Sequence, residues 1–160
     1  MSLFSRIITT VFVFFVFTIE ISAAQPFITT EKNSDVLVLK EKSVNLSIFT
    51  NSGIDNGILR AVKNLQSDFQ KVTGTQPTIL NQISGDNTPL IIIGTVGTKS
   101  VIDDLIKQKK IDAKALIGKT EKYIIQNISN PFPGVSEAIV IAGSDKRGTI
   151  YGIYEMSQQI

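Results

Sequence analysis

Apolar residues recur at intervals of three and four in three parts of the chain, and each part predicts an amphipathic helix. The first helix has an apolar face made of Ile58, Val62, Leu65, Phe69 and Val72. Ser52 or Asp55 can cap its N-terminus, and Gly74 ends it. The second helix carries Val101, Ile102, Leu105 and Ile106 and ends in Lys107, Lys109 and Lys110. The third begins after Asp145 and carries Ile150, Ile153, Tyr154, Ser157 and Ile160.

Six short segments have the pattern of β-strands. Residues 36–39 are an apolar run, and residues 44–48 alternate apolar with polar. Residues 78–80, 90–93, 123–126 and 138–141 follow, and the run at 90–93 has no alternation, as expected of a central strand buried on both faces. Turn residues at 130–134 predict an antiparallel hairpin between the last two strands. The pattern indicates one α/β domain, an α+β sandwich with a mixed β-sheet and about three helices.

The first 24 residues have the pattern of a secretory signal peptide. Arg6 gives a positive start, an apolar run covers residues 7–19, and small residues close the segment at Ser22, Ala23 and Ala24. The apolar run is short against the ~20 residues that span a membrane. We therefore expect cleavage after residue 24, a mature domain of residues 25–160, a secreted or periplasmic location, and no membrane attachment after cleavage.

Composition excludes several kinds of chemistry. The chain has 16 basic and 14 acidic residues, a balance that gives no reason to expect a nucleic-acid partner. It contains no cysteine and no histidine, which removes disulfides, thiolate or histidine metal sites, and every Ser-His triad. We expect neither a metal nor a cofactor.

Three short motifs are weak. Gly94 and Gly97 between a strand and a helix resemble a phosphate loop, but the third glycine of the dinucleotide fingerprint is missing and Lys99 is out of phosphate-loop order. A tight connection is the better interpretation, with nucleotide binding as a weaker alternative.

Asp103 and Asp104 are neighbours on a helix and so point in different directions, which predicts a solvated face. The glycosylation patterns at residues 45–47 and 127–129 fall in predicted strands and are attributed to chance.

The most informative stretch is residues 142–155. Ser144 or Asp145 can cap the last helix. Gly148 and Gly152 are four apart on one helix face, and each costs about 1 kcal/mol against alanine there. Two glycines in register therefore imply a close approach by another backbone or by a ligand. Beside them the sequence places two tyrosines and two cations: Tyr151, Tyr154, Lys146 and Arg147.

This stretch, together with residues 91–97 and 130–135, resembles the N-terminal domain of glycoside hydrolase family 115, the secreted xylan α-1,2-glucuronidases. The likeness extends to the small α/β domains that precede a (β/α)8 barrel in other glycosidases, such as β-hexosaminidases. It implies that the catalytic carboxylates lie in a barrel beyond Ile160. It also implies that residues from Asp145 to Tyr154 meet that barrel. Candidate substrate or interdomain contacts are Asp145, Lys146, Arg147, Gly148, Tyr151 and Gly152.

The last helix has no capping glycine and no basic final turn, a pattern that suggests a polypeptide cut from a longer one. The resemblance thus implies a non-catalytic accessory domain of an exported α-glucuronidase, inactive alone, whose partners are its own barrel and, through the full enzyme, glucuronoxylan. No catalytic residue is expected within the chain. The alternative is a stand-alone secreted carbohydrate-binding module, for which the chain is poorly equipped because it has no tryptophan.

Overall fold

The computed structural model describes residues 46–83, 85 and 89–160. The expected signal peptide, the strand at residues 36–39 and the glycosylation pattern at Asn45 lie outside the described residues. No helix in the described part is long and apolar enough to cross a membrane.

A five-stranded mixed sheet forms the centre of the molecule, with the strand order β2-β1-β3-β5-β4. Its strands are β1 (Ser47–Thr50), β2 (Thr78–Leu80), β3 (Leu90–Thr95), β4 (Tyr123–Phe132) and β5 (Val135–Gly143). All neighbouring strands run parallel except β4, which pairs antiparallel with β5. The mixed α/β sheet and the hairpin at residues 130–134 are confirmed.

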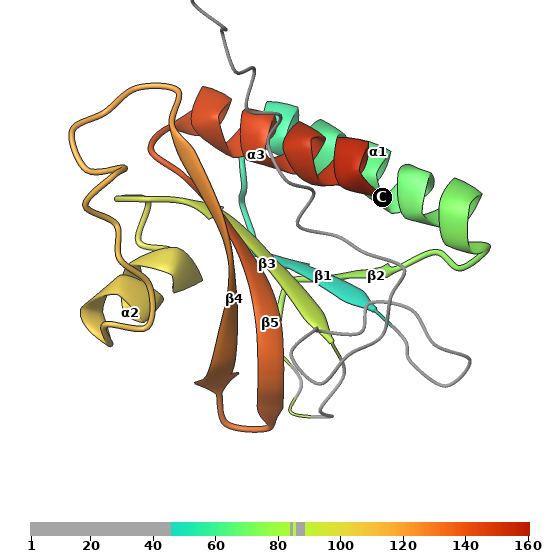
Figure 1. Ribbon diagram of the computed structural model, residues 1–160, viewed down its shortest axis with the longest axis horizontal. Coiled ribbons are helices and arrows are strands. Elements are labelled where there is room, and N and C mark those ends of the chain that lie inside the picture. Colours follow the sequence, from blue (N-terminus) through green and yellow to red (C-terminus); the bar gives the residue numbers. More distant parts are fainter. Residues whose placement is uncertain (1–45, 84, 86–88) are drawn as a thin grey trace, which may run out of the picture.

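Helices cover both faces of the sheet (Figure 1). The helices α1 (Asn56–Thr73) and α3 (Lys146–Gln159) lie on one face, and α2 (Val101–Lys107) lies on the other. Each face has its own apolar cluster. The α1/α3 side is built around Val62, Leu65, Ile91, Ile141 and Met156, and the α2 side around Phe49, Ile92, Ile102, Leu105 and Val140.

The first helix begins and ends where the sequence predicts. Asp55 is the N-cap, its side chain accepts a hydrogen bond from the Gly57 N–H, and Gly74 ends the helix with a left-handed backbone. One position departs from the expected apolar face, since Val72 is 62% exposed. Figure 1 shows the last turns of α1 extending past the end of α3, which leaves this valine without a covering helix.

Both β3 and β1 are completely buried, although only the pattern of β3 predicts it. All six residues of β3 are buried, as the unbroken apolar run predicts. The β1 strand begins at Ser47, later than expected, and its two polar residues Ser47 and Thr50 are also buried. An alternating pattern is typical of a half-buried strand. Here β1 lies between β2 and β3 with an apolar cluster on each face, Ile48 in one and Phe49 in the other, so Ser47 and Thr50 are shielded from water although they lie on opposite faces.

The buried face of α3 differs from the apolar pattern. Tyr154, expected inside, is 39% exposed, whereas the buried positions are Gly148, Thr149, Gly152, Ile153 and Met156. Two glycines and a threonine belong to this face because the helix lies very close to the sheet. Apolar periodicity could not detect that, since these residue types do not count as apolar.

Each parallel strand β1, β3 and β5 is followed directly by a helix. The N-termini of α1, α2 and α3 therefore lie at the carboxyl edge of the sheet, where open α/β sheets place their ligands. The residues singled out from the sequence lie at this edge and along α3.

Candidate functional site

The start of α3 holds the chain just before β4. The Ser144 N–H donates to the Lys122 carbonyl oxygen at 2.8 Å, and the Lys122 N–H donates to Ser144 Oγ at 3.0 Å. Asp145 caps α3 by accepting from the Gly148 N–H at 2.7 Å, and its other oxygen accepts from the Glu121 N–H at 2.8 Å. One carboxylate thus joins a helix start to a strand start. We call Ser144, Asp145 and Gly148 the α3 clamp.

The two glycines of α3 face the domain's own strand. A Cβ atom on Gly148 would overlap the Lys122 carbonyl oxygen. A Cβ atom on Gly152 would lie 2.8 Å from Ile141 Cγ2 and 3.1 Å from Tyr123 Cβ. The close backbone approach implied by the sequence is present, and its partner is β4. Of the two alternatives that the sequence left open, another backbone or a ligand, the structure shows the backbone of Lys122 at Gly148 and side chains of β4 and β5 at Gly152.

The two cations at the start of α3 make ion pairs within the domain. Lys146 Nζ lies 2.9 Å from Asp55 Oδ1, which connects the starts of α3 and α1. Arg147 lies 2.6 Å from Glu121 Oε1 and donates to the Tyr151 hydroxyl at 3.0 Å. All these side chains remain partly exposed, so each pair contributes little to stability.

Two aspartates and one arginine at this edge have pKa shifts that favour their charged forms. The backbone N–H groups of Gly148 and Glu121 lower the pKa of Asp145 below its usual value. The hydrogen bond from Lys146, followed by that from the Gly57 N–H, lowers the pKa of Asp55. The hydrogen bond to Tyr151 and the charge of Glu121 raise the pKa of Arg147. None of these shifts tunes a group toward neutral pH, as acid–base catalysis requires.

Behind the clamp lies a small buried hydroxyl network. The hydroxyls of Thr149 and Thr95 are 2.7 Å apart, and Thr149 Oγ1 also lies 2.9 Å from the Asp145 carbonyl oxygen and 3.3 Å from that of Gly94. Thr149 is fully buried. The network joins α3 to the end of β3. The sequence did not predict it, because the two threonines are 54 positions apart and no local pattern indicates that they are in contact.

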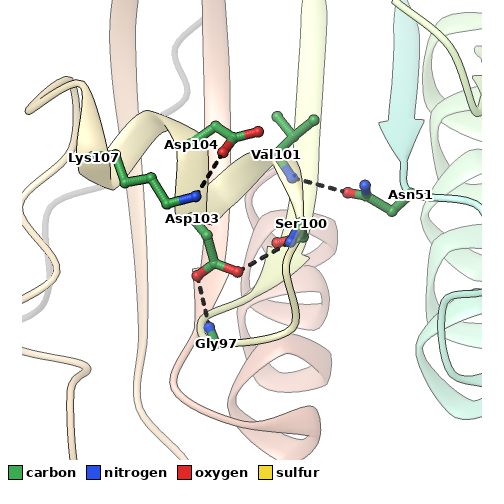
Figure 2. Close-up of polar contacts among 7 residues, drawn as sticks. All are labelled: Asn51, Gly97, Ser100, Val101, Asp103, Asp104 and Lys107. Atoms are coloured by element: carbon green, nitrogen blue, oxygen red, sulfur yellow. Dashed lines mark hydrogen bonds and ion pairs between the residues drawn. The ribbon is translucent and has the colours of Figure 1, made fainter.

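Side chains of α2 and of the residue after β1 accept the backbone N–H groups of the loop after β3 (Figure 2). The Asp103 carboxylate accepts from the Gly97 N–H at 2.7 Å and from the Ser100 N–H at 3.0 Å, and Asn51 Oδ1 accepts from the Val101 N–H at 3.2 Å. These donors are the ones that a phosphate would need. The structure supports the tight connection. It corrects the assignment of Asp103 to a solvated face, since only Asp104, ion-paired with Lys107, is largely exposed.

Two tyrosines of α3 are exposed to solvent. Tyr151 is 40% and Tyr154 is 39% exposed. Arg147 donates to the Tyr151 hydroxyl, and Asn64 of α1 donates to the Tyr154 hydroxyl at 3.0 Å. Both rings are therefore held in place while one side stays open. We call Arg147, Tyr151 and Tyr154 the outer face of α3.

A family model described as "Glycosyl hydrolase family 67 N-terminus" matches residues 31–156. The chain belongs to this family. The match spans every strand and all but the last residues of α3, so the clamp and the outer face both lie inside the family 67 N-terminal domain. The resemblance to a glycoside hydrolase N-terminal domain is confirmed, with family 67 as the family whose model matches. No curated protein matches the chain.

Two solved structures are similar to the domain. The domain is similar to BtGH115A, described as a family GH115 4-O-methyl-alpha-glucuronidase with specificity for decorated arabinogalactans, with 28% identity and a TM-score of 0.53. That similarity covers 72% of this chain and 13% of BtGH115A. CpGH84D shares the fold at 13% identity and a TM-score of 0.51, over 71% of this chain and 17% of that protein. The chain thus corresponds to a small part of these much longer proteins.

Proposed function

We propose that the chain is the non-catalytic N-terminal domain of an exported glycoside hydrolase that removes glucuronic acid or its 4-O-methyl ether from xylan side chains. The observation that carries the proposal is the family 67 N-terminal match over residues 31–156. The 28% identity to a 4-O-methyl-alpha-glucuronidase supports the reaction class. Export rests on the signal-peptide pattern of residues 1–24.

The roles of the acidic residues support a non-catalytic domain. Glycosidases generally place two carboxyl groups on either side of the scissile bond. In the part of the chain that the structure describes, seven of the nine carboxylates instead cap turns and helices or form ion pairs: Asp55, Asp68, Asp103, Asp104, Asp112, Glu121 and Asp145. In the proposal the two catalytic carboxylates belong to a barrel elsewhere in the enzyme.

The outer face of α3 is the surface on which we place that barrel. Tyrosine and arginine are enriched in protein interfaces. The rings of Tyr151 and Tyr154 are already anchored through their hydroxyls, so the packing of a partner on them costs little side-chain entropy. The neighbouring edge with Asp145, Lys146 and Arg147 would then border the substrate cleft.

Release of uronic acid tests whether the chain is non-catalytic and the complete protein is active. The chain incubated with glucuronoxylan should release no more uronic acid than a blank, and the protein encoded by the complete reading frame should release it. Release by the chain alone would overturn the proposal, as would a reading frame with no glycosidase barrel.

Tyrosine variants test the docking surface. In the complete protein, replacing Tyr151 and Tyr154 by alanine should lower the melting temperature by several degrees more than in the chain alone. The matched phenylalanine variants, which keep the rings, should behave like wild type in that comparison. An equal loss in both proteins would show that no other domain packs on this face.

The exposed rings also favour a second candidate, the stand-alone carbohydrate-binding module. Sugar rings stack on aromatic faces, and Tyr151 and Tyr154 present two on one helix. Co-sedimentation of the chain with insoluble neutral xylan, lost in the double alanine variant, would favour this function over the first.

A further inference from the structure

The positive charge of the chain is concentrated between α2 and β4. Residues 107–122 contain six lysines and two carboxylates, whereas the other 144 residues contain ten basic and twelve acidic side chains. We call these six the lysine stripe: Lys107, Lys109, Lys110, Lys114, Lys119 and Lys122. A chain with a net charge of only +2 therefore has one strongly basic segment.

The fold lays this segment along the outermost strand of the sheet. Lys110 Nζ contacts the carbonyl oxygens of Asn130 and Pro131 near the end of β4, at 2.7 and 2.8 Å. Lys122 directly precedes the start of the same strand. Figure 1 shows the connection running beside β4 between these two points. Between Lys122 and Asn130 the strand β4 advances eight residues, which at about 3.3 Å each is roughly 26 Å.

Buried apolar residues hold the segment in position while its lysines face solvent. Ile111, Ala113 and Leu116 are buried, the first and last in the α2-side cluster, and all the lysines except the half-buried Lys110 are exposed. The stripe is thus a fixed surface.

Little of this charge is neutralised locally. Lys107 pairs with Asp104 at 3.1 Å, and Lys114 lies 3.9 Å from Asp112, with all four side chains more than half exposed. The third carboxylate nearby, Glu121, pairs with Arg147 instead. Within the described residues, no ion pair involves Lys109, Lys119 or Lys122.

We propose that the lysine stripe binds an acidic polysaccharide, with the lysines pairing with uronate carboxylates along an extended chain. The choice of a sugar polymer rests on the proposed function. The stripe would act as a site that raises the local concentration of substrate.

The composition of the segment favours uronates over other ligands. Residues 107–122 contain no aromatic residue, so neutral sugars have no ring to stack on and nucleic-acid bases have none either. The segment also contains no arginine, the usual residue for bidentate phosphate contacts. Ammonium groups spaced along an edge suit carboxylates spaced along a polymer.

Binding to glucuronoxylan at low and high salt tests the proposal. The chain should bind soluble glucuronoxylan at 20 mM NaCl and lose most of that binding at 500 mM, where the Debye length falls to about 4 Å. The same xylan with its carboxyl groups chemically reduced should not bind. Lys109→Gln/Lys114→Gln/Lys119→Gln should weaken binding by about tenfold.

A matched variant supplies the control. Arg60→Gln/Lys63→Gln/Lys71→Gln removes the same three charges from α1 and should bind as wild type does, with both variants checked for unchanged melting. Equal weakening in both variants, undiminished binding of the reduced xylan, or tighter binding of duplex DNA than of glucuronoxylan would each overturn the proposal. None of these results depends on catalysis by the complete enzyme, so the stripe and the proposed function can fail separately.

Discussion

The carbonyl oxygen of Lys122 occupies the place where a side chain at Gly148 would begin. This relationship joins the first turn of α3 to the residue before β4, 26 positions earlier in the sequence. It explains why a helix tolerates a glycine there. The glycine allows α3 to lie directly on the strand, where Ser144 and Asp145 hold the same segment by hydrogen bonds.

Replacing Gly148 by alanine should destabilise the domain although alanine is the better helix former. The gain in helix propensity is about 1 kcal/mol. The overlap with a backbone oxygen that cannot move alone costs more, and we expect a net loss of about 1–3 kcal/mol in the free energy of unfolding by urea. The control is Gly57→Ala, whose nearest neighbour is the flexible end of Lys146 at 2.9 Å. A neutral or stabilising Gly148→Ala would contradict the close packing.

The buried hydroxyl pair should behave as one unit. Thr149→Val removes the hydroxyl that faces Thr95 and leaves a polar partner unsatisfied, so we expect a loss of about 1–3 kcal/mol. Thr95→Val should cost a similar amount. The double variant should cost clearly less than the sum, because the second change removes a partner already left alone. Strict additivity in urea unfolding would show that the two hydroxyls do not interact.

Stability should change little between pH 5 and 8 and fall in acid. The chain has no histidine, and Asp55, Asp68 and Asp145 all have a pKa lowered from 3.8 in the folded state. A lowered pKa contributes stability that is present above the unfolded value and is lost as pH drops through the folded one. Melting temperatures should therefore decline only below about pH 4. Asp145→Asn should make that decline shallower, and a decline that starts near pH 6 would contradict the assignment.

The loop after β3 should be insensitive to nucleotides and sensitive to Asp103. Since Asp103 already accepts from two loop N–H groups, millimolar nucleotide should not shift the melting temperature. Asp103→Asn should lower stability by about 0.5–2 kcal/mol through the lost cap. Asp104→Asn removes only an exposed ion pair and should stay within about 0.5 kcal/mol. A nucleotide-dependent shift of the melting temperature would contradict this prediction and indicate a ligand site in the loop.

Local features of the sequence predicted most of the elements. The interval of apolar residues located α1 and its caps, and the unbroken run at residues 90–93 identified the most deeply buried strand. The turn residues at 130–134 predicted the antiparallel hairpin. These predictions succeed because period, capping and turn chemistry act over a few neighbouring residues.

The candidate site was only partly predictable. The sequence singled out residues 142–155 and required a close approach at the glycines, but it left open what approaches them. It also placed Tyr154 inside and described Asp103 as solvated. Each outcome depended on a partner distant in the sequence, such as Asn64 for Tyr154 or Lys122 for Gly148.

The sequence alone therefore determined the class of fold, the limits of its first helix and the motif by which the domain resembles glycoside hydrolases. The tertiary structure decided which residues that motif contacts. Its glycines and its Asp145 hold β4, while Tyr151 and Tyr154 remain on the surface. The physical reason is that hydrogen bonds and close packing between distant segments depend on how the sheet brings those segments together, and the residues themselves carry no local sign of it.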